Sequence, residues 1–223
     1  EDNVVKILQN AKRRINRVDA RTQVVKDLGV LLHSPSLLDK FDRNRDVISV
    51  KGGVVDLRDG SFRPRSAQDY CTFELDIDYG GLELDTANVD EFVDAITLGD
   101  AEYARYLQTF LGYSITGHVS EQIFALWCGS GANGKGVLQN LINKLFGRGR
   151  YTVQMPHNAL IDTGKKKDMD SPSPAVMGLE GKRIAFIDET DKVARLDESM
   201  VKNLTGNSVI TARALHENLA TFE

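Results

Sequence analysis

The residues best suited to chemistry lie in one glycine-rich stretch, Gly129-Ser130-Gly131-Ala132-Asn133-Gly134-Lys135-Gly136. It follows an apolar run at residues 123–128, which predicts a buried strand, and it precedes apolar side chains at helical spacing from Val137 onward. Glycines let backbone N–H groups turn toward a phosphate, and a helix N-terminus adds a favourable dipole. A strand, a glycine loop, a lysine and a helix in this order are the context that a P-loop requires. We therefore predict a nucleotide site over residues 129–137, in which Lys135 binds the β- and γ-phosphates.

One position departs from the usual P-loop pattern. A Ser or Thr normally follows the lysine and ligates Mg²⁺, whereas this chain has Gly136. A magnesium ion would then depend on water, phosphate oxygens and a carboxylate from elsewhere, so we expect weakened metal affinity. A glycine-rich turn with a coincidental lysine is the alternative explanation, and the flanking strand and helix patterns argue against it.

Two adjacent carboxylates provide the second chemical group. An apolar strand pattern over residues 183–187 ends in Asp188 and Glu189. In a P-loop ATPase the first acid holds Mg²⁺, directly or through water, and the second polarises the attacking water as a general base. Side chains alternate along a strand, so the two acids point in different directions, which suits two separate roles. The alternative is a strand that simply ends in surface acids.

Composition narrows the class of protein. The chain has 223 residues, 41% of them hydrophobic, which is enough for a packed core and excludes a disordered chain. Its net charge of −4 does not indicate nucleic-acid binding, so any DNA contact requires a local basic patch. Cys71 and Cys128 indicate reduced thiols rather than a disulfide framework. No apolar run has the length of a membrane span, and no signal peptide is visible.

Hydrophobic periodicity divides the chain into four regions. We predict a helical segment over residues 1–45, a β-hairpin and linker region over 46–80, a helical region over 81–120 and the P-loop core over 121–223. The predicted elements include helices at 4–18, 21–32, 88–98 (capped by Asn88) and 101–111 (ended by Gly112), and short strands at 47–50 and 54–57. Basic runs at Lys12-Arg13-Arg14 and Lys165-Lys166-Lys167 are better explained as solvated surface than as DNA contacts.

Several motifs together resemble a known family, the phage/plasmid and poxvirus-type primase-helicases, which are superfamily 3 helicases of the AAA+ group. The motifs, in order along residues 40–223, are Gly52-Gly53-Val54-Val55-Asp56-Leu57, Phe110-Leu111-Gly112-Tyr113-Ser114-Ile115-Thr116-Gly117 with Glu121-Gln122, the glycine loop, Phe186-Ile187-Asp188-Glu189, and Leu204-Thr205-Gly206-Asn207 through Ala212-Arg213. The combination is specific, although each motif alone is not.

The resemblance implies a fold and an activity. The fold would be α/β, a P-loop AAA+-like core with a parallel sheet, preceded by a smaller mixed helical and β-hairpin domain whose region 81–120 resembles an oligomerisation collar. The activity would be a replicative DNA helicase that uses ATP and Mg²⁺, with Lys135 on phosphate, Asp188 on the metal and Glu189 on the water. The partners would be single-stranded or forked DNA and further copies of the chain in a homo-hexamer. A primase domain upstream, a viral, plasmid or prophage origin and a host-cytoplasmic location complete these expectations.

The resemblance also places a DNA-contacting hairpin after Arg213, with His216 and Asn218 as further candidates. Relatives often carry a Tyr-Lys pair where this chain has Glu217. The family's sensor asparagine and arginine finger would lie beyond Glu223, which follows a strand-like pattern, so we expect a piece of a longer protein with weak or no ATP hydrolysis of its own.

Three other functions compete with the helicase interpretation. One is a P-loop switch or DNA-packaging motor without unwinding activity. Another is a non-catalytic replisome or DNA-binding module with a decayed P-loop, which Gly136 favours. A small-molecule kinase is the weakest, because kinases rarely place adjacent Asp-Glu on this strand and no acceptor site is evident.

Overall fold

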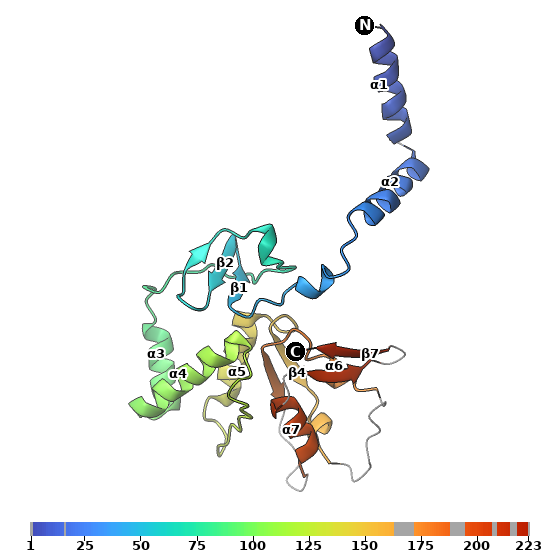
Figure 1. The fold of residues 1–223 in the computed structure, drawn as a ribbon. Coiled ribbons are helices and arrows are strands. Elements are labelled where there is room, and N and C mark those ends of the chain that lie inside the picture. Colours follow the sequence, from blue (N-terminus) through green and yellow to red (C-terminus); the bar gives the residue numbers. More distant parts are fainter. Residues whose placement is uncertain are drawn as a thin grey trace. The chain divides into compact units, whose positions relative to one another are not determined.

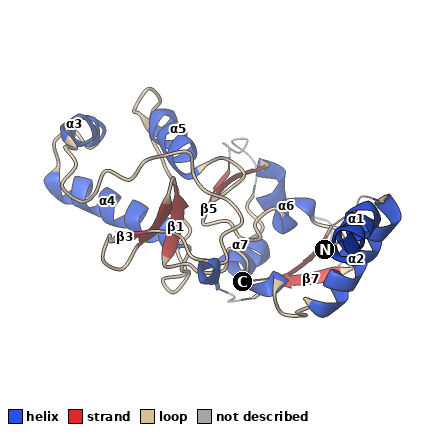
Figure 2. Cartoon of the chain, turned by 90° about the horizontal axis from the view of Figure 1, so that it is seen from above, coloured by secondary structure: helices blue, strands red, loops and turns tan. Residues whose placement is uncertain are grey.

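A computed structural model describes residues 2–15, 17–162, 172–187, 195–206, 209–214 and 218–222 (Figure 1). The chain divides into two compact units, residues 1–41 and 42–223. The described strands form three separate small sheets, drawn in red in Figure 2. The architecture is therefore mixed α/β, with one parallel pair of strands.

The first unit is helical, as its periodicity predicts. It contains α1 (Asp2–Ile15), α2 (Val18–Leu31) and a short 3₁₀ helix, η1 (Leu38–Lys40). Many of its apolar side chains are exposed, among them Leu8 and Leu31. The two helices therefore contribute none of the buried apolar side chains of the described chain.

The second unit begins with an antiparallel sheet. Strand β1 (Val47–Val50) pairs with β2 (Gly53–Asp56), which pairs with the short β3 (Phe62–Arg63); a 3₁₀ helix, η2 (Ala67–Asp69), follows. The predicted hairpin is confirmed, because tight turns at Gly52 and Gly60 join apolar strands. One face of the sheet packs against later parts of the chain in a core of Ile48, Val50, Val55, Leu75 and Tyr151.

Two helices follow, α3 (Ala87–Ile96) and α4 (Ala101–Thr116). Asn88 is not the cap of α3, because Thr86 precedes the first helical residue. Nor does Gly112 end α4: this helix continues to Gly117, whose left-handed φ of 71° closes it. The last turn of α4 carries Ile115, which packs against the sheet core, so tertiary packing outweighs the helix-weakening effect of glycine.

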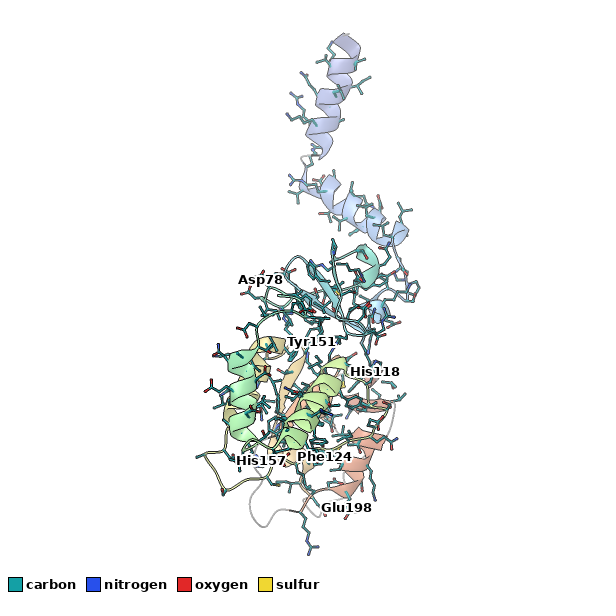
Figure 3. All side chains as sticks on the ribbon, turned by 90° about the vertical axis from the view of Figure 1, so that its left-hand side faces the viewer. Asp78, His118, Phe124, Tyr151, His157 and Glu198 are labelled. Carbon is teal, nitrogen blue, oxygen red and sulfur yellow. The ribbon has the colours of Figure 1, made fainter. Side chains whose placement is uncertain are left out.

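The predicted strand over residues 123–128 is wrong. These residues form a coil with no ladder to any described strand, and Ile123 and Leu126 are 48% and 68% exposed. Figure 3 labels Phe124, another exposed member of this coil. The apolar composition indicates a strand, but a strand also needs a hydrogen-bonding partner along its edge.

The parallel pair follows the glycine loop. Helix α5 (Lys135–Phe146) leads to β4 (Thr152–Met155), and β5 (Ile184–Ile187) pairs with β4 in parallel, in the register Thr152↔Ile184. Leu138 and Ile142 of α5 are buried against Leu107 of α4. The neighbourhood of α3, α4 and α5 is visible in Figures 1 and 2.

The remaining elements form a small third cluster. It contains α6 (Pro174–Met177), α7 (Glu198–Gly206) and the antiparallel hairpin of β6 (Ile210–Arg213) and β7 (Leu219–Phe222); η3 (His157–Leu160) precedes it in the chain. Val176, Ala212 and Phe222 form its buried core. Within the described residues, no helix is long and apolar enough to cross a bilayer.

Candidate nucleotide-binding site

The glycine loop adopts a backbone suited to binding an anion. Gly131, Ala132 and Gly134 have φ values of 100°, 49° and 80°, and Gly134 is the N-cap of α5. Alternation of left- and right-handed backbone turns successive N–H groups toward one side, which makes an anion-binding concavity. Lys135 is the first residue of α5, so its charge and the helix N-terminus lie together, as predicted.

Lys135 has a partner within the loop. Its Nζ donates a hydrogen bond to Asn133 Oδ1 at 2.9 Å. The Asn133 side chain also covers Gly129, because a Cβ on that glycine would lie 1.7 Å from Asn133 Nδ2. A side chain at Gly129 would therefore displace the Asn133 amide from its present position, and a phosphate oxygen would compete with that amide for the lysine.

The loop is supported from outside by α3. A Cβ on Gly134 would lie 2.4 Å from Cγ2 of Ile96. Gly134 therefore has two reasons to be glycine, its left-handed backbone and the close approach of this helix. Gly136 differs, because a Cβ there would meet no atom within 4 Å and the position could carry a larger side chain.

Helix α5 and strand β5 share a hydrophobic cluster. Ile184 and Phe186 of β5 pack against the buried face of α5, and Trp127 meets Phe186 with ring centroids 5.9 Å apart. The helix that begins at Lys135 therefore packs against the strand that precedes the predicted acids. Asp188 and Glu189 themselves lie outside the described residues.

Arg183, at the start of β5, joins that strand to the antiparallel sheet. Its Nη1 donates to the carbonyls of Arg45 and Ile115 at 3.1 and 2.8 Å, and its Nη2 donates to those of Asn44 and Val47 at 3.1 and 2.6 Å. Its guanidinium also lies 4.5 Å from the ring centroid of Tyr151. Burial lowers the pKa of this guanidinium, which has carbonyl partners rather than a carboxylate.

Tyr151 completes this junction, and Figure 3 labels it. Its carbonyl accepts the backbone N–H of Arg183 at 2.8 Å, and its hydroxyl accepts the backbone N–H of Ser49 at 3.4 Å. Burial raises the pKa of the phenol. The position of β5 is thus tied to the segment 44–49 by two side chains that sequence patterns did not single out.

The predicted DNA-contacting residues lie on or beside the β6–β7 hairpin. Arg213 ends β6, is half-buried and pairs in register with Leu219, while the exposed Asn218 precedes β7. The Arg213 Nε is buried and has no hydrogen-bond partner among the described residues. His216 lies outside the described residues.

No metal-binding cluster of His, Cys, Asp and Glu occurs within the described parts of the chain. The acids after β5, which carry the predicted metal role, lie outside those parts. The described loop supplies backbone N–H groups and the Lys135 ammonium, so it is suited to phosphate oxygens rather than to a cation.

Comparisons with known proteins agree with the motif resemblance. The family described as "D5 N terminal like" matches residues 2–98, which include the first helices that the motifs left aside. A mimivirus protein named "Putative helicase L207/L206", from Acanthamoeba polyphaga mimivirus, is 28% identical over 99% of this chain and 22% of its own length. "Putative helicase 184R" of Invertebrate iridescent virus 6 is 24% identical over 91% of this chain and 21% of its own length. "Putative primase C962R" of African swine fever virus is 22% identical over 99% of this chain and 23% of its own length.

These likenesses support a distant relation to viral proteins of the primase-helicase type. The chain spans 22%, 21% and 23% of the length of these three relatives, and their names describe the whole proteins. The match to the D5 family lies upstream of the glycine loop, and the longer relatives extend over the loop and β5.

Proposed function

We propose that this chain is the nucleotide-binding portion of an ATP-dependent DNA helicase of the superfamily 3 type. The observation that carries the proposal is Lys135, placed at the first residue of α5 behind a loop of left-handed residues. ATP phosphates would bind the loop from Gly129 to Val137, displacing Asn133 from the lysine. The names of the viral relatives favour a helicase over other P-loop proteins.

The catalytic steps would be divided among three side chains. Lys135 would neutralise the β- and γ-phosphates, Asp188 would hold Mg²⁺, and Glu189 would take a proton from the attacking water. Because β5 packs against α5, the residues that follow β5 would face the phosphates at the carboxyl edge of the parallel strands.

The assembly would be a homo-hexamer that moves along single-stranded DNA, with a primase domain upstream in the same polypeptide. The β6–β7 hairpin would follow the DNA backbone, with Arg213, His216 and Asn218 as contacts. Such contacts are sequence-independent and depend on positive charge.

A second candidate is a non-catalytic module that binds nucleotide or DNA without hydrolysis. Gly136 favours it, because the usual hydroxyl ligand for Mg²⁺ is missing from the sequence. We expect ATP binding to depend on Mg²⁺ in the helicase and not in the non-catalytic module. Measurements of binding with and without Mg²⁺ therefore distinguish the two functions.

Nucleotide binding by the wild-type chain and by Lys135→Ala, with and without Mg²⁺, tests the proposal. Removing a charge-assisted contact to phosphate costs about 1.5–3 kcal/mol, so we expect at least a roughly tenfold loss of ATP affinity. Lys144→Ala is the matched control, because this lysine lies in the last turn of the same helix. Equal ATP affinity of wild type and Lys135→Ala would refute the site, and binding that ignores Mg²⁺ would favour the non-catalytic module.

A further inference from the structure

A cluster of cations lies outside the glycine loop. We call Arg43, Arg45, Arg148, Arg150 and Lys182 the basic cluster. It comes from three distant stretches of chain that hydrogen bonds bring together: Lys182 Nζ donates to the Gly149 carbonyl at 2.9 Å, and Arg183 Nη1 donates to the Arg45 carbonyl at 3.1 Å. Arg43 forms an ion pair at 3.1 Å with Glu180, two residues before Lys182.

Two of these cations sit on a tight turn between α5 and β4. Gly147 and Gly149 have φ values of 70° and 81°, and the Arg150 N–H donates to the Gly147 carbonyl at 2.9 Å. Arg148 and Arg150 are both exposed. The Arg150 guanidinium lies 5.0 Å from the ring centroid of Phe73, which holds its planar face and leaves its edge available for hydrogen bonds.

The nearby carboxylates each have a partner, which for Glu180 is a member of the cluster and for Asp42 and Asp46 lies outside it. Glu180 pairs with Arg43, Asp42 accepts the N–H and hydroxyl of Thr72, and Asp46 lies 3.2 Å from His118 Nε2. Within the described residues, no carboxylate forms an ion pair with Arg45 or with the last three members of the cluster, Arg148, Arg150 and Lys182.

The cations also repel one another. Burial lowers the pKa of the Lys182 ammonium, and the neighbouring charge of Arg150 lowers it further, while the Asp42 and Glu180 carboxylates act in the opposite direction with smaller effects. Such crowding is notable in a chain whose net charge is −4, because the overall composition offers no general attraction for anions. A bound polyanion would relieve this repulsion.

We propose that the basic cluster binds the phosphate backbone of single-stranded DNA, as a second contact surface besides the β6–β7 hairpin. Arginine guanidinium groups bind phosphates with two parallel hydrogen bonds. Cations from three chain segments suit a row of phosphates better than one small phosphate ion. The proposal rests on the DNA-binding function proposed above and names a surface for it.

The test measures binding of a fluorescent oligothymidylate by anisotropy at several salt concentrations. The variant carries Arg148→Gln with Arg150→Gln; the control removes two lysines already paired with acids, Lys51→Gln with Lys202→Gln. For single strands the logarithm of affinity falls with the logarithm of salt by about 0.7 per phosphate contact. Two lost contacts reduce the slope by about 1.4, so between 50 and 200 mM salt the wild type loses roughly sevenfold more affinity than the variant.

A reduced slope in the cluster variant, with the wild-type slope in the lysine control, supports the proposal. Equal slopes in wild type and cluster variant overturn it, as does an equal reduction in both double variants. Failure of the wild-type chain to bind DNA also overturns it; if Lys135→Ala still weakens ATP binding, the nucleotide site stands independently. Binding of each variant to poly-glutamate is measured in parallel. If the cluster variant loses as much affinity for poly-glutamate as for oligothymidylate, the partner is an acidic protein and the DNA assignment is overturned.

Arg148→Gln alone keeps the test valid if the double variant misfolds. No hydrogen bond or ion pair of the Arg148 side chain occurs among the described residues, so this change leaves the turn intact. Its expected slope change is about 0.7. Thermal unfolding of each variant, followed by Trp127 fluorescence, checks that the fold is retained.

Discussion

Replacing Arg183 should weaken the junction between β5 and the antiparallel sheet. The guanidinium donates four hydrogen bonds to carbonyls of two separate segments, residues 44–47 and the end of α4, and three of these bonds are at least partly buried. Arg183→Met removes all four donors while keeping an unbranched apolar chain. Arg183→Lys keeps the charge but cannot reach all the carbonyls or stack on Tyr151 in the same way.

The magnitude follows from the carbonyls left without a partner. A partly buried acceptor that loses its donor costs about 1–3 kcal/mol, and removing a buried charge returns part of this. Three such carbonyls at the lower end give about 3 kcal/mol for Arg183→Met. For a unit of this size, 1 kcal/mol shifts the melting temperature by roughly 2–4 °C, so we expect a decrease of about 6–12 °C.

The assay can be confined to the second unit. The chain has one tryptophan, Trp127, and its ring contacts Phe186 of β5, so its fluorescence reports on this part of the fold. Arg58→Lys is the matched control, because this arginine is exposed and its partner Asp56 lies on the same sheet; no measurable shift is expected. A melting temperature for Arg183→Met within 2 °C or so of wild type would show that the four hydrogen bonds do not hold the junction.

Two further predictions concern the loop and the sheet. Gly136→Ser should increase ATP affinity roughly tenfold in the presence of Mg²⁺ only, because the open space at this position admits a hydroxyl that can ligate the metal. Gly136→Ala is the control. Both variants are titrated with ATP with and without Mg²⁺, and equal ATP affinities of the two variants in the presence of Mg²⁺ would contradict the reasoning. Asp69→Asn should destabilise the chain by about 1–3 kcal/mol at pH 7, because the buried carboxylate accepts hydrogen bonds from Arg63 and Ser66. These bonds, chiefly those from Arg63, hold the pKa of Asp69 well below its usual range, so its stabilisation is present above about pH 4 and is lost as pH falls further. Urea unfolding of both proteins at pH 7 and pH 3 should show the difference shrinking in acid, and a constant difference would contradict this.

Local signals predicted several elements well. The hairpin of β1 and β2, the start of α5 at Lys135 and the strand β5 all depend on turn residues and periodicity within a short stretch. The predicted strand at residues 123–128 was wrong, because strand pairing depends on a neighbour elsewhere in the chain. The end of α4 failed for a related reason, since Ile115 gains burial from a sheet formed by a different segment.

In the candidate site, too, some features depend on local sequence and others on distant segments of the chain. The glycine loop and Lys135 form a recognisable local motif, and the structure places them at a helix N-terminus. Arg183 was not predictable, because its partners are carbonyls of residues 44–47 and 115, which carry no side-chain signature. The contact of Asn133 with Lys135 is local, but an asparagine two residues before the lysine has several possible partners in a loop.

Because Lys135 donates a hydrogen bond to Asn133, the Asn133 amide would compete with a phosphate for this lysine. In the proposed function the lysine would exchange between a state held by the amide and a state available to phosphate, and nucleotide would bind tightly only to the second. The apparent dissociation constant is the intrinsic one divided by the fraction of chains in the available state, so a lysine held for about nine-tenths of the time binds roughly tenfold more weakly. Whatever stabilises the available state, whether a neighbouring subunit or bound DNA, would raise nucleotide affinity without contacting the nucleotide.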